Sequence, residues 1–329
     1  MPKSSADPDA FLAVGIQSAL GTPQTTAAKF RFVKYLSGSD VEAQIEAVDL
    51  REGGDGLDFG YAFKRMQKTV GQIVANVRPE ALGQLLAAVP GGATWSGGSA
   101  PATHIFHTGH ASHPWMTLQI AHPGTSLVNH LYDARFTGIT LEGGAGDLVK
   151  VTIPFAAINH GASVTVLTPT YYGDDPFAYF IGPSYLIDAA AATGMTAWKI
   201  EMGLGVEELQ AQEIKLDEMV VQNRDTNVEY TIRYEDATRW KKIYMGAGVT
   251  PTTSIATGAL DLVMQYDTGA TLKLLRLQTR LLSYRGNKLT ELDPDGKTVM
   301  ETVSAKALKG ATHTFIAELR NAHASAYGS

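Results

Sequence analysis

The sequence predicts a mainly β fold made of two tandem antiparallel β-sandwich or barrel modules, each flanked by one short α-helix. Three observations support this prediction. Short runs of alternating apolar and polar residues recur along the chain, only two segments have helical periodicity, and the order of strands and helix is repeated once. With 329 residues, 44% of them hydrophobic and 18% charged, the chain can bury one large core or two ordinary ones, and we expect two domains.

Strands are expected where apolar and polar residues alternate in short runs that end at Gly, Asp or Pro. These runs are KFRFVKYL, HPWMTLQIA, LVNHLYDARF, VKVTIPF, MTAWKIEMG, ALDLVMQYD and TLKLLRLQTRLL. Because each run has one apolar and one polar face, the pattern is typical of antiparallel sheets with one face on a core and the other in water.

Two segments have the apolar spacing of a helix. The first, RPEALGQLLAAVP (78–90), has Pro79 in a position that suits the first helical turn, and it ends at a Pro-Gly pair. The second, YEDATRWKKIYMG (234–246), is expected to have Glu235 and Asp236 in its first turn, where the helix dipole favours negative charge. Each predicted module therefore contains one short helix.

The two halves align in the order of their elements. Residues 75–92 lie over 231–248, and residues 122–136 lie over 267–281 with a constant shift of 145, since 269 − 124 = 145. The order of elements supports a duplicated module more strongly than the sparse identities do. The expected parts are an N-terminal arm (1–29), a first module (30–160), a linker (161–195), a second module (196–310) and a C-terminal arm (311–329).

Charge and composition exclude several classes of function. A formal net charge of −6 and a pI of about 5.8 argue against a surface that holds nucleic acid by its phosphates. The absence of cysteine excludes disulfides, thiolate nucleophiles and zinc sites that contain Cys. No apolar run suits a signal peptide or a membrane span, so we expect a product made as a soluble cytoplasmic protein with no membrane partner.

Four histidines are spaced three residues apart in HIFHTGHASH, namely His104, His107, His110 and His113. Imidazole is a common zinc ligand, which makes this segment a candidate metal site. Residues three apart on a strand point to opposite faces, however, and Gly109 disfavours a helix. We therefore expect no metal here, but a polar loop whose histidines face solvent or a neighbouring chain.

No other motif indicates an enzyme, and we predict no catalytic, cofactor-binding or metal-binding residues. The chain lacks a G-x-S-x-G elbow, a phosphate-binding loop and an H-E-x-x-H motif. REGGDGLDFG (51–60) resembles a calcium loop through Asp55 and Asp58 but lacks its ligand spacing, so a hairpin tip is the better interpretation. The aromatic segment 168–185 is either a stacking surface for sugars or bases, or a core edge or interface.

Three stretches together resemble the major tail tube proteins of long-tailed, siphovirus-type bacteriophages. They are AVGIQSALGTP, NVRPEALGQLLAAVPGG and ARFTGITLEGGAGDLVKVTIPFAAI, and the resemblance covers roughly residues 11–158. It implies modules that join side by side into a ring whose inner sheet lines a channel, and rings that stack into a tube. Because many such proteins have one module, this chain is similar to the double-module version.

The resemblance also implies surfaces and partners. Residues 37–64 would form the long hairpin that reaches the next ring, with Arg51, Glu52, Asp55 and Asp58 at its tip. The chain would bind other copies of itself, a tape measure protein in the lumen, and a tail terminator and a distal tail protein at the ends. DNA would pass through an electronegative channel without specific binding. Six modules per ring would require three chains, assembled in the host cytoplasm into a virion tail.

Two other functions are compatible with an all-β chain of this composition. One is a carbohydrate-binding or hydrolytic protein that uses the aromatic residues and paired carboxylates. The other is a different tail component that shares the tube fold, such as a terminator or a baseplate protein. Rings or tubes in electron micrographs would distinguish a tail tube protein from a carbohydrate-binding or hydrolytic protein. A high copy number in the particle would distinguish it from another tail component.

Overall fold

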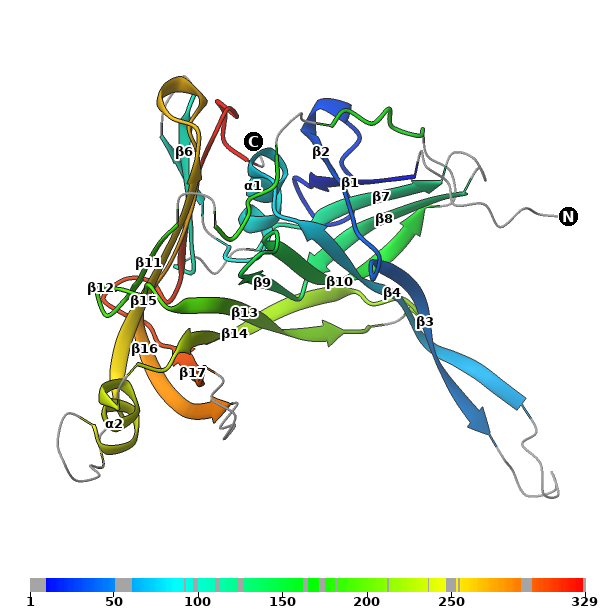
Figure 1. The fold of residues 1–329 in the computed structure, drawn as a ribbon. Helices are drawn as coiled ribbons and strands as arrows, with labels where there is room; N and C mark the ends of the chain where they lie inside the picture. The colour runs from blue at the N-terminus through cyan, green and yellow to red at the C-terminus, as the bar shows by residue number, and fades with distance from the viewer. Residues whose placement is uncertain are drawn as a thin grey trace, which may run out of the picture.

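The computed structural model confirms a mainly β protein with two short α-helices (Figure 1). Its described strands pair in an antiparallel manner within one hydrogen-bonded network. The structure describes residues 10–50, 61–91, 93–96, 100–109, 113–122, 127–161, 165–171, 175–180, 183–211, 213–235, 237–246, 253, 255–290 and 298–327.

The first half of the chain contains ten described strands. They are β1 (Phe11–Ile16), β2 (Phe30–Val33), β3 (Asp40–Leu50), β4 (Tyr61–Asn76), β5 (Ala93–Ser96), β6 (Ala102–His107), β7 (Met116–His122), β8 (Leu127–Phe136), β9 (Gly138–Gly144) and β10 (Lys150–Gly161). The second half contains β11 (Ser184–Ile187), β12 (Ala190–Ala191), β13 (Met195–Leu209), β14 (Glu218–Arg233), β15 (Thr257–Tyr266), β16 (Lys273–Thr290), β17 (Met300–Ala307) and β18 (Ile316–Asn321).

The helices lie close to their predicted positions. The first, α1 (Pro79–Ala88), begins at the predicted proline, and all its residues are buried. The second, α2 (Thr238–Met245), is shorter than predicted, and Glu235 lies before its first turn, while Asp236 is outside the described residues. The backbone N–H of Tyr234 donates to the Val299 carbonyl, which keeps the chain in the sheet until just before the helix. Neither of these helices has the length and apolar character required to cross a bilayer.

The two halves have the same strand order. Neighbouring strands in the first half are β1–β7–β8–β10–β4–β3, and those in the second half are β11–β15–β16–β17–β14–β13. In each half the last two strands of this order form a long hairpin, and the helix follows that hairpin in the chain. The remaining strands of each half, such as β2, β5, β6 and β18, are additions to this shared pattern.

The halves also share the places where strand register is interrupted. The pairing slips between Glu46 and Ala47 in β3 and between Gly205 and Val206 in β13, and it slips between Met116 and Leu118 in β7 and between Gly258 and Leu260 in β15. In both hairpins the extra residue lies in the second strand, Arg65 in β4 and Gln222 in β14. The residues that face these bulges, Glu46 and Gly205, are 159 apart, since 205 − 46 = 159. β-Bulges are specific features of a sheet, so their recurrence is a strong sign of a shared pattern.

Register also corrects the sequence alignment of β8 with β16. Leu118 pairs with Leu131, and Leu260 pairs with Thr279, so matching positions in these strands are 148 apart, since 279 − 131 = 148. The shift of 145 predicted from sequence was wrong. It rested on scattered Gly, Leu and Arg identities, which do not report the pairing partner of a strand.

The two halves are joined by strands and by one continuous core. β9 pairs with β13 from Gly138–Gly203 to Gly144–Ala197, and β18 pairs with β6 on one edge and β16 on the other. A single cluster of buried apolar side chains contains residues of both halves, including Leu85 and Trp198. The halves are therefore parts of one packed body in this structure.

The ranges predicted as arms and linker contain paired strands. β1 lies within 1–29 and pairs with β2 and β7, while β11 lies within 161–195 and pairs with β15. β18 lies within 311–329. Strand pairing thus assigns these segments to the sheets of the protein, with β11 as the first strand of the second half.

Candidate assembly and channel surfaces

A polar sheet face runs across the junction of the two halves. On β13, the buried side chains of Trp198, Ile200 and Met202 alternate with the more exposed side chains of Lys199 and Glu201. Successive residues of a strand point to opposite faces, so one face of this strand packs on the core and the other carries charge. Neighbouring strands β9, β10, β14 and β17 continue the same alternation.

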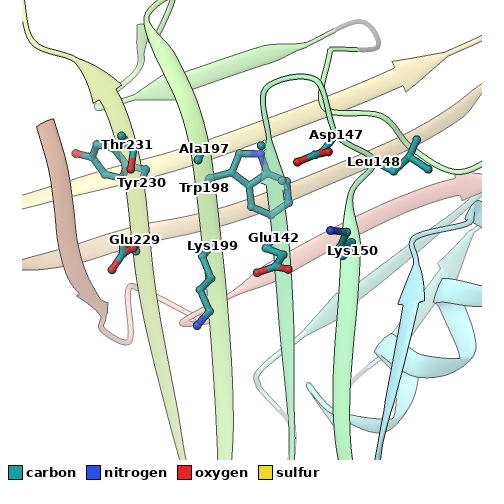
Figure 2. A pocket seen from close by; sticks show the side chains of 12 residues that line it. Glu142, Asp147, Leu148, Lys150, Ala197, Trp198, Lys199, Glu229, Tyr230 and Thr231 are labelled. Carbon is teal, nitrogen blue, oxygen red and sulfur yellow. The ribbon is translucent and has the colours of Figure 1, made fainter. Parts of the chain in front are cut away.

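Charges of opposite sign lie directly across from each other on this face. Lys150 of β10 is opposite Glu142 of β9, Glu142 is opposite Lys199 of β13, and Lys199 is opposite Glu229 of β14. Figure 2 shows these four side chains in a row on neighbouring strands. The Lys199 Nζ also lies 3.0 Å from a Glu201 carboxylate oxygen. That hydrogen bond, followed by the charges of Glu201, Glu142 and Glu229, raises the pKa of Lys199.

The same residues line a depression over the junction, together with Asp147 and the edge of Trp198. Its lining offers carboxylates and ammonium groups already opposed to each other, with no nucleophile positioned beside a general base. Three carboxylates, of Glu142, Asp147 and Glu229, face two ammonium groups, of Lys150 and Lys199, so the surface is polar with a small excess of negative charge. A phosphate passing over it would meet lysines that carboxylates already neutralise.

The first long hairpin, β3–β4, projects from the body of the molecule (Figure 1). Its stem exposes large apolar side chains, with Ile45 52% and Tyr61 54% exposed. Exposed apolar side chains gathered on one projecting element are typical of a contact surface. The predicted tip residues Arg51, Glu52, Asp55 and Asp58 lie outside the described residues.

The second long hairpin, β13–β14, has a different environment. Its end lies against β4, where the Lys68 Nζ is 2.5 Å from a Glu208 carboxylate oxygen. The Gln67 N–H donates to the Ile214 carbonyl at 3.0 Å, and Leu216 is buried. Nothing in the sequence indicated this docking, because the contact joins residues about 140 positions apart.

The predicted histidine loop is wrong for the residues that the structure describes. His104 and His107 lie on β6, and His110 is outside the described residues. His104 is buried, with its Nε2 2.9 Å from the His323 carbonyl, because β6 pairs with β18 near the C-terminus. The His107 ring stacks on His313, with ring centroids 4.0 Å apart.

His113 is also buried rather than facing solvent. Its Nε2 lies 3.0 Å from a guanidinium nitrogen of Arg224. Burial lowers the pKa of His113 to about 4, and the positive charges of Arg224 and Arg135 act in the same direction. Within the described ranges, no three His, Asp or Glu side chains are grouped so that they could hold a metal ion.

The aromatic segment 168–185 contributes mainly to the core. Phe177, Tyr179 and Tyr185 are buried, and burial raises the pKa of Tyr179 to about 12. The Tyr185 hydroxyl donates to the Tyr179 carbonyl, so its polar end is satisfied inside the protein. Of the two interpretations of this segment, the described residues support the core edge over a stacking surface for sugars or bases.

Comparison with known proteins agrees with this picture of a non-catalytic β protein with long hairpins. A family model described as phage tail tube protein matches residues 8–307. A search of curated proteins found no match. The matched range includes both halves, both hairpins and the charged sheet face. The chain therefore belongs to the phage tail tube protein family, and it is a non-enzymatic structural protein of the virion tail that polymerises into the tail tube.

Proposed function

We propose that this chain is a double-module tube protein and that three copies close into one ring of six modules. The observation that supports this most strongly is the shared strand order of the two halves, together with the matching bulges in the β3–β4 and β13–β14 hairpins. A closed ring needs complementary edges on each repeating unit. Two units in one chain halve the number of chains from six to three.

The polar face across β10, β9, β13 and β14 is proposed to line the channel. Its opposite face is occupied by the core, so only the polar face is available to a lumen. Glu142 and Glu229 flank Lys199 on both sides, which leaves little free positive charge to hold a phosphate. DNA would then slide past a channel of net negative potential without specific binding, and the tape measure protein would fill the same lumen before ejection.

The β3–β4 hairpin is proposed to contact the next ring, with the tail terminator and the distal tail protein at the two ends of the tube. The exposed Tyr61 and Phe63 side chains near its tip support this role, because a stacked ring would bury them. Another tail component sharing the tube fold would differ in copy number, which quantitative gel analysis of purified particles measures directly.

Cryo-electron microscopy of assembled tubes tests the ring. The expected result is three chains per ring with approximately sixfold shape and the charged face on the lumen. Six chains per ring, or a second half standing outside the tube wall, would contradict the double-module proposal.

Shortening the first hairpin tests its role in stacking. Replacing residues 50–58 with a tight turn is expected to leave the unassembled chain folded and to block tube growth. A matched variant shortens the tip of the second hairpin at residues 210–214, where Gln210 bonds to the Arg65 carbonyl of its own chain. That variant is expected to lower the melting temperature instead. Normal tubes from the first variant would remove β3–β4 from any inter-ring contact.

A further inference from the structure

The contact between two halves of one chain provides a template for the contact between two chains. β9 of the first half presents its outer edge to β13 of the second half, with Thr140 opposite Glu201. This contact is head-to-tail, because it joins two different edges. A head-to-tail contact repeated between identical units generates a ring when the rotation closes.

The counterpart of β9 in the second half is the end of β16. Thr140 of β9 is opposite Thr152 of β10, and Lys288 of β16 is opposite Thr302 of β17. β10 and β17 have the same place in the strand order, and the matching positions are 148 and 150 apart, since 288 − 140 = 148 and 302 − 152 = 150. Lys288 therefore occupies the position of Thr140.

The counterpart of β13 in the first half is β3. Both are the first strands of the long hairpins, and the residues that face the bulges, Glu46 and Gly205, lie 159 residues apart. Glu42 of β3 therefore occupies the position of Glu201, since 201 − 42 = 159. Figure 1 shows β3 on one side of the molecule and the α2 end of the second half on the other.

Both counterpart edges lack a strand partner among the described residues. β3 pairs with β4 only, and β16 beyond Ser283 pairs with β17 only. The exposed fractions of two matching side chains show that β13 is covered by its neighbour and that β3 is not. Leu204 of β13 is 7% exposed, whereas Ile45, its counterpart on β3, is 52% exposed. An unpaired edge with exposed apolar side chains is poorly tolerated in water and favours pairing with another strand.

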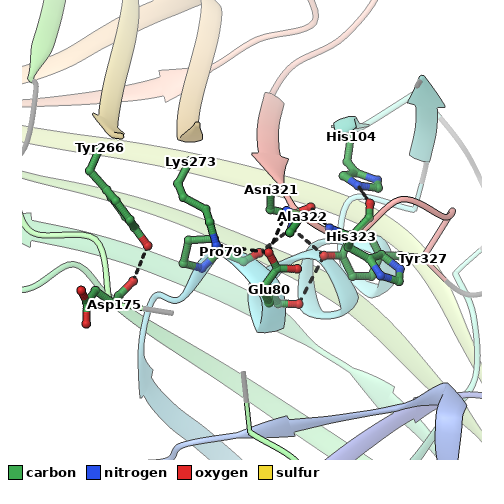
Figure 3. A network of polar contacts seen from close by, with 10 residues as sticks. All are labelled: Pro79, Glu80, His104, Asp175, Tyr266, Lys273, Asn321, Ala322, His323 and Tyr327. Carbon is green, nitrogen blue, oxygen red and sulfur yellow. Dashed lines mark hydrogen bonds and ion pairs between the residues drawn. The ribbon is translucent and has the colours of Figure 1, made fainter. Parts of the chain in front are cut away.

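The two helices also differ in how far they are covered, which is an independent observation. At the junction within the chain, α1 is covered by the second half, where Lys273 and Asn321 bond to its first turn (Figure 3). No residue of α2 is buried, and Tyr244 is 66% exposed. The same head-to-tail step that covers α1 would bring the first half of a second copy towards α2.

We infer that residues 286–290 of one chain pair in an antiparallel manner with residues 40–44 of the next copy, Lys288 lying opposite Glu42. This inference rests on the proposed ring and assigns its inter-chain register. The internal pairs Gly138–Gly203 and Thr140–Glu201 translate into Gly286–Gln44 and Lys288–Glu42. Lys288 and Glu42 are both exposed in the single chain and have opposite charge, which favours them as a direct cross-strand pair.

Disulfide trapping tests the register, because the chain has no cysteine of its own. The variant Glu42→Cys with Lys288→Cys is assembled and mildly oxidised, and its products are separated on a non-reducing gel. We expect covalent dimers and trimers and no larger species, since three links close the ring. The matched control is Gln44→Cys with Lys288→Cys, whose cysteines lie on the same face but diagonally apart. Its cross-linking yield is expected to be roughly tenfold lower, because a disulfide needs close Cβ atoms.

The outcomes separate the register from the ring. Tubes whose control variant cross-links as well as the designed pair would overturn the register and leave the proposed ring intact. Cross-linked species larger than three chains would support the edges but refute three chains per ring. Wild-type protein that forms neither rings nor tubes would overturn both proposals.

Charge exchange provides a second measurement for the case in which cysteine variants assemble poorly. Glu42→Lys alone is expected to reduce tube yield, and Glu42→Lys combined with Lys288→Glu is expected to restore it. Failure of the double variant to recover any yield, with both variants folded by circular dichroism, would contradict a direct contact between these side chains.

Discussion

Replacing Glu80 with alanine is expected to weaken the junction between the two halves. Glu80 lies in the first turn of α1, and its side chain is 5% exposed. One carboxylate oxygen is 3.4 Å from Lys273 Nζ and accepts a hydrogen bond from the Ala322 N–H at 2.8 Å. Figure 3 shows that both partners come from the second half, where Tyr327 also reaches this turn.

Glu80→Ala would lower the free energy of unfolding by removing a hydrogen bond and an ion pair. A charge-assisted hydrogen bond contributes about 1.5–3 kcal/mol, and the Ala322 N–H would lose its acceptor. Lys273 would in addition lose its ion-pair partner in a mostly buried site. We expect Glu80→Ala to reduce the free energy of unfolding by about 3–4 kcal/mol. Glu80→Gln keeps an acceptor for Ala322 and is expected to cost about half as much.

Urea unfolding of the unassembled chain at neutral pH measures these differences. Glu46→Ala is the matched control, because Glu46 forms an exposed ion pair with Arg65 and is expected to contribute less than about 1 kcal/mol. A Glu80→Ala variant as stable as the Glu46→Ala control would refute the conclusion that this carboxylate holds the halves together.

The other predictions concern His113, Gly83 and metal. The pKa of His113 is about 4 in the folded chain, below the ordinary value of 6.5, so the unfolded state binds more protons between these pH values. The free energy of unfolding should therefore fall by up to about 3 kcal/mol as pH drops from 6.5 to 4. Thermal unfolding of His113→Gln over the same pH range should show a smaller fall. Gly83→Ala places a Cβ 2.1 Å from the Tyr327 ring and should cost about 1–3 kcal/mol in urea unfolding despite the better helix propensity of alanine. Chelators should leave the melting temperature unchanged, and stoichiometric zinc found by elemental analysis would contradict that expectation.

Local sequence patterns predicted the elements of the fold well. Alternation located β7, β8, β13 and β15, and the Pro79 start located α1, because these features depend on residues that are close in sequence. The hairpin at residues 37–64 was expected from the resemblance to tail tube proteins. The bounds of α2 were less accurate, since the pairing of residues 233–234 with distant carbonyls delays the helix.

Contacts between distant segments could not be predicted from the sequence. Nothing near His104 indicates that β18, more than 200 residues later, covers it. Glu80 would be expected in solvent at a helix start, yet it is buried because residues 321–327 fold over α1. The charged row on the sheet face was missed as well, because its members come from four strands and become neighbours only through register.

The different surroundings of the two hairpins have a consequence for how rings of this chain fit onto each other. The end of β13–β14 is occupied by its own chain through Lys68 and Glu208, while β3–β4 projects. In the proposed ring, six hairpin positions would therefore provide three free arms. Successive rings would match only at rotations of about 120°, twice the angular step available to six identical arms. The fused chain would thereby limit the number of ways in which one ring can be seated on the one before it.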